Sequence, residues 1–292
     1  MGRRTLNERC PACGARATAE DEKGSARCNV REFSNETFTF LRCSSCRSLR
    51  CVEAVDLDRY YARYPFKRHR LDLWTRVAYG NMLRRLVRAG LKADARILDY
   101  GCGPGLWVDY LKGRGYSNVA GYDAFEPRYS DRAALAERYD LVFSQDVLEH
   151  AESPRGFLDE ISRLARPGAL VHLGTPNAAR IDLDRAEEFA IDLHPPYHRH
   201  ILSEGALLDL AGKRCLRPIA KYDRYYYDTL FPGVNYRFLK AYVAADGNTI
   251  DVLFGPPRFD LVARSPRLIF LAAFGFLSPP RSMLTLILRK DD

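Results

Sequence analysis

Four cysteines near the start of the sequence have the spacing of a metal site. Cys10 and Cys13 form one C-x-x-C pair, and Cys43 and Cys46 form a second. Each pair places two thiolates on one tight turn, and two such turns can close a tetrahedral shell of four sulfurs, which suits zinc. Because a closed shell leaves no open position for water or substrate, we predict a structural zinc rather than a catalytic one.

The residues around these cysteines predict a small module that depends on its metal. Between the two pairs, Phe, Val and Thr alternate with polar residues, a pattern typical of a β-hairpin. The module, residues 1–55, is too short for a large core, and structural zinc can contribute roughly 10–16 kcal/mol to folding. Cys28 and Cys51 remain as bystanders or substitute ligands. We therefore predict an N-terminal zinc ribbon.

A second chemical feature is the glycine-rich turn in the stretch ILDYGCGPGLW. An apolar run reaches Asp99, and Gly101, Gly103 and Gly105 follow before a helical pattern begins. Glycines at alternate positions leave the main chain bare, so that a planar or extended ligand can lie against it. The dinucleotide fingerprint needs its third glycine at position 106, where this chain has leucine. The spacing therefore favours a different nucleoside ligand.

The segments that must position this turn alternate between strands and helices. This order predicts an α/β fold: a mostly parallel, Rossmann-like sheet with helices on both faces. Ligands are then expected at the carboxyl ends of the strands. We predict strands at 95–101, 118–123, 139–145, 169–177 and 283–290, and helices at 106–112, from Pro154 to about Ala165, and from about Ser203. An aromatic-rich stretch at 222–280 is a candidate substrate lid or extra core.

Residues 56–92 form a predicted helical linker between the ribbon and a cofactor-binding domain at 93–292. Nine lysines and arginines between Arg59 and Arg88 oppose a single acid, Asp72, and the whole chain carries a net charge of +8. This balance favours an anionic partner, although a solvated helix face explains most of the charges. The apolar positions at helical spacing are Leu73, Val77, Leu83, Leu86 and Val87.

The glycine turn resembles motif I of class I S-adenosylmethionine-dependent methyltransferases. Three later segments resemble further motifs of that family in the same order: GYD, YDLVFSQDVLEH and LARPGALVHLGTPN. The resemblance implies that the acid ending GYD accepts hydrogen bonds from the ribose hydroxyls of S-adenosylmethionine. The cofactor-binding residues that it implies are Asp99, Gly101, Cys102, Gly103, Gly105, Asp123 and Gln145.

The chain departs from this family pattern at one place. Only about sixteen residues separate Asp123 from the next motif, too few for the usual helix, third strand and adenine-contacting loop. We therefore expect an unusual adenine pocket, and leave its contacts unassigned, with Phe125 and Asp131 as candidates.

Asp146, Glu149 and His150 follow the fourth strand at the edge where a substrate should arrive. Histidine can take a proton near neutral pH, so we predict His150 as the catalytic base, oriented by Glu149 or Asp146. The D-x-x-E-H spacing also resembles the E-x-x-E-H pattern of small RNA 3′-end and ubiquinone-pathway O-methyltransferases. That resemblance implies a second divalent metal at Asp146, Glu149, His150 and His198. The alternative is that Glu149 and His150 cap the next helix.

A zinc ribbon followed by a YY segment resembles bacterial enzymes that methylate sugars and polysaccharide precursors. We therefore predict methyl transfer to a hydroxyl of a sugar or a polysaccharide or lipid precursor, with a phosphate on the acceptor for the basic cluster. An RNA methyltransferase is the first alternative. A sugar C-methyltransferase, using Tyr60, Tyr61 or Tyr64, is the second, and an inactive interaction module is the third.

Hydropathy bears on the location of the protein. No apolar run reaches the eighteen or so residues that a bilayer span requires, and the first residues have no apolar signal core. We therefore predict a cytoplasmic protein. The longest apolar run, Leu268–Leu277, is expected to be a buried helix or strand rather than a membrane contact.

Overall fold

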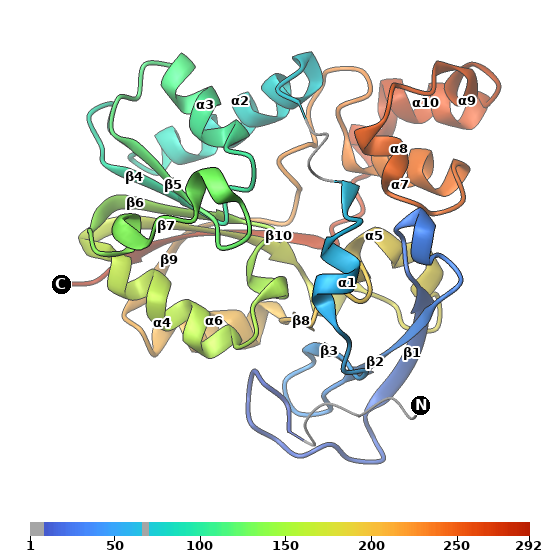
Figure 1. The fold of residues 1–292 in the computed structure, drawn as a ribbon, viewed down its shortest axis with the longest axis horizontal. Helices are drawn as coiled ribbons and strands as arrows, with labels where there is room; N and C mark the ends of the chain where they lie inside the picture. The colour runs from blue at the N-terminus through green and yellow to red at the C-terminus, as the bar shows by residue number, and fades with distance from the viewer. Residues whose placement is uncertain (1–8, 66–69) are drawn as a thin grey trace.

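A computed structural model of the chain describes residues 9–65 and 70–292. Its centre is a six-stranded sheet in the order β5-β4-β6-β7-β10-β9 (Figure 1). Neighbours among the first four strands are parallel, whereas β10 runs antiparallel to both β7 and β9. The predicted α/β class with a mostly parallel sheet is thus confirmed. The strands are β4 (Ile97–Tyr100), β5 (Val119–Tyr122), β6 (Tyr139–Gln145), β7 (Ala165–Pro176), β9 (Leu216–Tyr222) and β10 (Met283–Lys290).

Two helix layers bury the faces of this sheet because consecutive strand residues point to opposite sides. Leu98 and Val142 pack with α4 (Pro154–Leu164) and α6 (Glu204–Gly212), whereas Ile97 and Leu141 pack with α2 (Leu73–Arg88) and α3 (Leu106–Gly113). Ser153 caps α4 by accepting the Gly156 amide, and Pro154 occupies the first turn, as the sequence predicts.

The segment between β5 and β6 lacks a strand, in agreement with its shortness. All of residues 123–138 are described, and they form two short 3₁₀ turns, Pro127–Tyr129 and Arg132–Leu135, instead of a helix and a third strand. The sheet therefore ends at β5, and Phe125 in this loop is exposed.

The N-terminal part folds as a small antiparallel sheet with strands β1 (Glu22–Arg27), β2 (Thr37–Arg42) and β3 (Leu49–Cys51). The predicted hairpin is present: β1 pairs with β2 in full register, and β2 leads directly into Cys43. A fourth strand, β8 (His200–Ile201), comes from the loop after β7 and pairs with β3. The small sheet thus includes a piece of the large domain.

The linker differs from the predicted single helix. It contains α1 (Leu57–Tyr61) and α2, and residues 66–69 of the predicted helix lie outside the described residues. Two expected inward positions, Leu73 and Val87, are exposed, because α2 instead packs through Ala78, Tyr79 and Met82 with Leu83 and Leu86. The basic cluster is also divided: Arg85 is buried, stacks on Tyr222 and donates to the Tyr225 carbonyl.

The aromatic-rich stretch adds helices beside the sheet rather than extending it (Figure 1). Within the described residues, no helix combines the length and apolar character that a membrane crossing requires. The expectation of a buried segment at 268–277 is wrong for half of it, because Leu268 and Leu271 are buried but Ile269 and Phe270 are exposed. The helices of this region are α7 (Tyr236–Ala245), α8 (Asp251–Phe254), α9 (Phe259–Ala263) and α10 (Pro266–Phe274). A short helix, α5 (Ala190–Leu193), lies earlier in the chain.

Arg42 ties the small sheet to the large domain and gives a test of their coupling. Its buried guanidinium donates to the carbonyls of Ala178 (2.6 Å) and Ile181 (2.5 Å) and pairs with Glu22. We expect Arg42→Leu to lower the free energy of unfolding by about 1–3 kcal/mol for each orphaned carbonyl. Urea denaturation measures this loss.

Arg47→Gln is the matched control, because Arg47 pairs with the same Glu22 but is exposed. This variant should lose less than about 1 kcal/mol. Equal losses in the two variants would contradict the coupling through Arg42.

Candidate active site

The glycine turn lies at the carboxyl end of β4 and has the conformation that glycine permits. Gly101, Gly103 and Gly105 all have positive φ values, of 80°, 49° and 82°. The amides of Gly101 and Cys102 both donate to the Tyr122 carbonyl on β5, at 2.7 and 3.1 Å, which fixes the turn against the neighbouring strand. A Cβ at Gly101 would lie only 2.3 Å from Val147. Both backbone strain and crowding therefore exclude larger residues there.

Two acids face this turn. Asp99 is buried near the carboxyl end of strand β4, and burial, together with the nearby charge of Asp123, raises its pKa well above the usual range. The Asp123 carboxylate accepts the Gly103 amide at 2.9 Å and the amides of Phe125 and Glu126 at 2.9 and 3.1 Å. A buried acid beside a second acid is costly unless a cation comes close. S-adenosylmethionine carries an ammonium and a sulfonium, so these residues fit it.

The end of β6 carries Gln145 and Asp146 in a connected network. The Gln145 amide donates to Asp146 Oδ1 at 2.9 Å, and the Tyr225 hydroxyl donates to Asp146 Oδ2 at 2.6 Å. His172 Nε2 lies 3.0 Å from Gln145 Oε1, and a Cβ at Gly174 would collide with the Gln145 amide. Burial raises the pKa of Asp146 to about 6. Asp146 is thus held by its neighbours.

Glu149 lies at the centre of the candidate acceptor side. It is fully buried, and Thr175 donates to its Oε2 at 3.0 Å. No donor in the described part of the chain reaches Oε1, which lies 3.8 Å from His198 Nε2. His198 Nδ1 lies 2.8 Å from the Asp192 carbonyl, so Nδ1 carries the proton and Nε2 presents its lone pair. Burial and the Asp146 charge raise the pKa of Glu149 well above its usual range.

His150 completes this group, and burial changes its expected chemistry. Ligand atoms of Glu149, His150 and His198 all lie within 4.8 Å of one another, whereas Asp146 is not in the set. Burial lowers the pKa of His150 to about 4, so it is neutral at physiological pH but a weaker base than the sequence suggests. A neutral imidazole is suited to binding a metal ion.

The three candidate tyrosines after the ribbon separate into different roles. The Tyr61 hydroxyl lies 3.1 Å from His150 Nδ1, and the Tyr64 hydroxyl lies 2.9 Å from His194 Nε2. Tyr60 instead donates to Glu36 at 2.7 Å, away from the histidines. Tyr61 and Tyr64 therefore bring the linker to the candidate acceptor side.

The four predicted zinc ligands converge. Their sulfurs lie within 4.8 Å of one another, with Cys10 Sγ 3.6 Å from Cys46 Sγ and Cys13 Sγ 3.7 Å from Cys43 Sγ. A tetrahedral zinc with Zn–S bonds of about 2.3 Å requires sulfurs about 3.8 Å apart, so the donor set fits the metal. Cys28 and Cys51 lie outside this cluster.

Sequence reasoning missed several residues that complete the site. Thr175 holds Glu149, Tyr225 holds Asp146, and Asn29 in the ribbon contacts His194 Nδ1 at 2.5 Å. Thr175 belongs to the TPN motif and could have been found there. Asn29 and Tyr225 had no local signal, because each lies far along the chain from its partner.

The strand order, the glycine turn and the acids at the strand ends define a class of enzyme, the S-adenosylmethionine-dependent methyltransferases with a Rossmann-like sheet. A family model described as "Methyltransferase domain" matches residues 69–217. The chain belongs to this family.

Individual relatives are more distant. The ubiquinone biosynthesis O-methyltransferase of Roseobacter denitrificans is 32% identical over 129 residues, 37% of this chain and 52% of the relative. Its counterpart in Pseudomonas aeruginosa is 31% identical over 112 residues, 31% of this chain and 47% of the relative. The chain thus spans about half the length of the curated relatives it matches. A solved 1,6-didemethyltoxoflavin-N1-methyltransferase from Burkholderia thailandensis covers 87% of this chain and 96% of its own, at 17% identity and a TM-score of 0.45.

The four-cysteine cluster yields a prediction about metal content. Purified protein should contain one zinc per chain by mass spectrometry, and Cys43→Ser should lose it, because three sulfurs leave the shell open. Cys28→Ser is the control, since Cys28 is equally buried but outside the cluster. Zinc retained in Cys43→Ser, or lost in Cys28→Ser, would show that the ligand set is different.

Proposed function

We propose that this methyltransferase transfers the methyl group of S-adenosylmethionine to a hydroxyl of a small acceptor. The cofactor side consists of Asp99, Gly101, Cys102, Gly103, Gly105, Asp123 and Gln145. The acceptor side consists of Glu149, His150 and His198, with Asp146 between the two. The observation that carries the proposal is the buried Glu149 Oε1, which lacks a donor among the described residues and faces the lone pair of His198.

The acceptor side has the donor set of a divalent cation. One carboxylate and two neutral imidazoles suit Mg, Mn or Fe(II), and the Asp192 carbonyl orients His198 as outer ligands of metal sites do. Glu149, His150 and His198 would hold the ion. When bound, it would lower the pKa of the acceptor hydroxyl. Asp146 is left out of our ligand set because Tyr225 and Gln145 already occupy its oxygens.

The protein residues then perform two tasks during transfer. The glycine turn and Asp123 fix the nucleoside, so that the methyl group points toward the ends of β6 and β7. As the acceptor oxygen attacks the methyl carbon, the bond from that carbon to the sulfonium sulfur breaks, S-adenosylhomocysteine leaves, and the hydroxyl proton passes to the Glu149 carboxylate. Holding both reactants in line is worth roughly 7–11 kcal/mol of the barrier, and proton transfer a smaller share.

The acceptor class follows from the named relatives and from the linker charges. Relatives named as ubiquinone biosynthesis O-methyltransferases support an oxygen of a small molecule. We retain a sugar or a polysaccharide or lipid precursor as the acceptor. An RNA acceptor was favoured by the basic cluster between Arg59 and Arg88. Part of this cluster is not free to bind phosphates, because Arg85 is buried and Arg59 and Arg63 pair with Glu36 and Glu32.

Carbon methylation of a sugar is the second candidate. The contact between Tyr61 and His150 favours it, since those enzymes use a tyrosine together with a Glu-His pair. Product NMR distinguishes the two, because a methyl on oxygen and a methyl on carbon have well-separated carbon shifts.

The first test concerns the cofactor side. Asp123→Ala should weaken binding of S-adenosylmethionine by about 10- to 100-fold in isothermal titration, because charge-assisted hydrogen bonds are lost. Asp140→Ala removes the same charge near the amino end of β6, at the opposite end of the strand from the glycine turn, and should bind normally. Equal affinities in Asp123→Ala and wild type would contradict the cofactor placement.

The second test concerns the acceptor side. His198→Ala should lower Mn²⁺ affinity about 10- to 100-fold, while S-adenosylmethionine binding stays unchanged. His200→Ala is the control, because His200 lies on β8 and contacts the Glu152 carbonyl instead. A chelator that leaves the structural zinc in place should also slow turnover, and Mn²⁺ should restore it. Normal Mn²⁺ binding by His198→Ala would exclude this ligand set.

A further inference from the structure

Helix α10 is apolar on both of its sides, unlike a helix at a water-exposed surface. Its inner side packs Leu268 and Leu271 against the protein, Leu268 with Val243 of α7. A period of about 3.6 residues places Ile269, Phe270 and Phe274 on the opposite side. They are 52%, 60% and 50% exposed, and the rings of Phe270 and Phe274 are 5.3 Å apart. A helix that is apolar all round needs a cover on its outer side.

The neighbouring loop extends this exposed side. The Gly233 amide donates to the Ala272 carbonyl at 2.9 Å, and the buried Asn235 side chain donates to the Leu271 carbonyl at 2.9 Å. These bonds fix the loop against α10. We call the combined surface the apolar face, and it consists of Leu230, Phe231, Ile269, Phe270, Phe274 and Leu277. Exposed apolar side chains that gather on neighbouring segments in this way are typical of interaction surfaces.

The charges around the apolar face favour an anionic partner. Residues 261–282 contain three arginines and no aspartate or glutamate. Arg281 pairs with Asp223, whereas Arg264, just before α10, and Arg267, in its first turn, are exposed. Two copies of the chain meeting through this face would bring like charges together, which opposes self-association. An anionic lipid surface instead offers hydrocarbon for the apolar residues and phosphates for the arginines.

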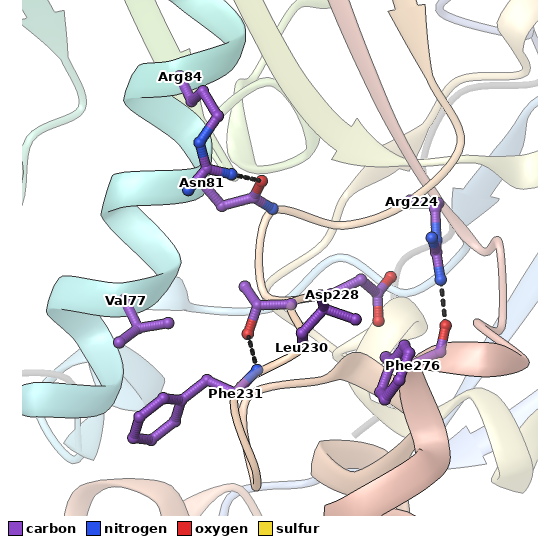
Figure 2. A pocket seen from close by; sticks show the side chains of 9 residues that line it. Val77, Asn81, Arg84, Arg224, Asp228, Leu230, Phe231 and Phe276 are labelled. Carbon is purple, nitrogen blue, oxygen red and sulfur yellow. Dashed lines mark hydrogen bonds between the residues drawn. The ribbon is translucent and has the colours of Figure 1, made fainter.

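A cavity next to the apolar face adds to this arrangement. It measures about 350 Å³, and Leu230, Phe231 and Phe276 form its apolar wall. Figure 2 shows Arg84, on α2, and Arg224 at two sides of it. The apolar wall of the cavity and the two arginines are therefore adjacent, and Asp228 also belongs to the lining.

We propose that the apolar face docks the enzyme on the surface of a bilayer that contains anionic lipids. Ile269, Phe270, Phe274 and Leu277 enter the boundary between headgroups and acyl chains, and Arg264 and Arg267 lie at the phosphates. Figure 1 places α9 and α10 at one corner of the molecule, at the periphery of the helices around α7, where a flat membrane can reach them. Docking of this kind crosses no bilayer and needs neither cofactor nor acceptor.

Co-sedimentation with vesicles tests this proposal on the full chain. Vesicles of phosphatidylcholine with about a third phosphatidylglycerol should bind the protein, and pure phosphatidylcholine vesicles should bind it roughly 25-fold more weakly, since each of the two arginines contributes roughly fivefold. Added salt should reduce the difference. Trp74 lies beside Gly233 of the same loop, so its fluorescence should shift to shorter wavelength on binding.

Two variants locate the binding surface. Phe270→Ser combined with Phe274→Ser should weaken vesicle binding by about tenfold or more, because the removed rings supply buried apolar area. Arg264→Gln combined with Arg267→Gln should abolish the preference for anionic vesicles. Val87→Ser is the matched control, since Val87 is 50% exposed on α2 and outside the apolar face. All substituted side chains are exposed, so thermal unfolding should remain as in wild type.

Three outcomes would overturn the proposal. The first is no binding of wild-type protein to either vesicle, and the second is unchanged binding by the double phenylalanine variant. The third is a wild-type dimer in light scattering that the same variant converts to a monomer, because a second copy would then cover the face. None of these measurements uses methyl transfer, so they are separate from the tests of the proposed reaction.

Discussion

Burial of carboxyl groups at one edge of the sheet is the constraint on which the site depends. Asp99, Asp146 and Glu149 all lie at the carboxyl ends of β4 and β6, and burial raises the pKa of each. Removing a carboxylate from water costs several kcal/mol unless donors or cations replace the water, as an order-of-magnitude figure. Asp146 has two donors, in Tyr225 and Gln145, whereas Glu149 receives a donor at only one oxygen from residues 9–65 and 70–292. The remaining negative charge of Asp99 and Glu149 would be balanced by the positive charge of a bound cationic cofactor and, in our proposal, of a metal ion.

The sequence predicted those parts of the structure that depend on local pattern. The strand at 139–145 and the strand at 283–290 are found with their predicted bounds, because short and almost continuous apolar runs with polar residues at their ends define them locally. The absence of a strand between β5 and β6 was predicted from the small number of residues between Asp123 and β6 alone. The prediction that residues 268–277 are buried was wrong in part for α10, because a continuous apolar run does not indicate which side of a helix packs against the protein. Only the packing of Leu268 and Leu271 reveals that the other side is exposed.

Contacts across long sequence separations could not be predicted. The ribbon supplies Asn29 to His194, and the Cys51 amide donates to the Arg199 carbonyl. The Arg199 amide in turn donates to the Glu149 carbonyl at 2.8 Å. A chain of backbone contacts thus leads from the small sheet to the candidate acceptor side. Because β8 belongs to that sheet, the loop that carries the histidines is built partly by the ribbon. The small N-terminal sheet therefore contacts the candidate acceptor side directly.

The same loop connects the site to the helices beside the apolar face. Asp192 is fully buried and accepts hydrogen bonds from Tyr236 (2.7 Å) and Lys240 (2.5 Å), both on α7. Its backbone carbonyl meanwhile orients His198. Helix α7 also packs on α10 through Val243 and Leu268. Since a displaced carbonyl would free the His198 tautomer, the position of α7 and the donor geometry of the acceptor side are physically linked.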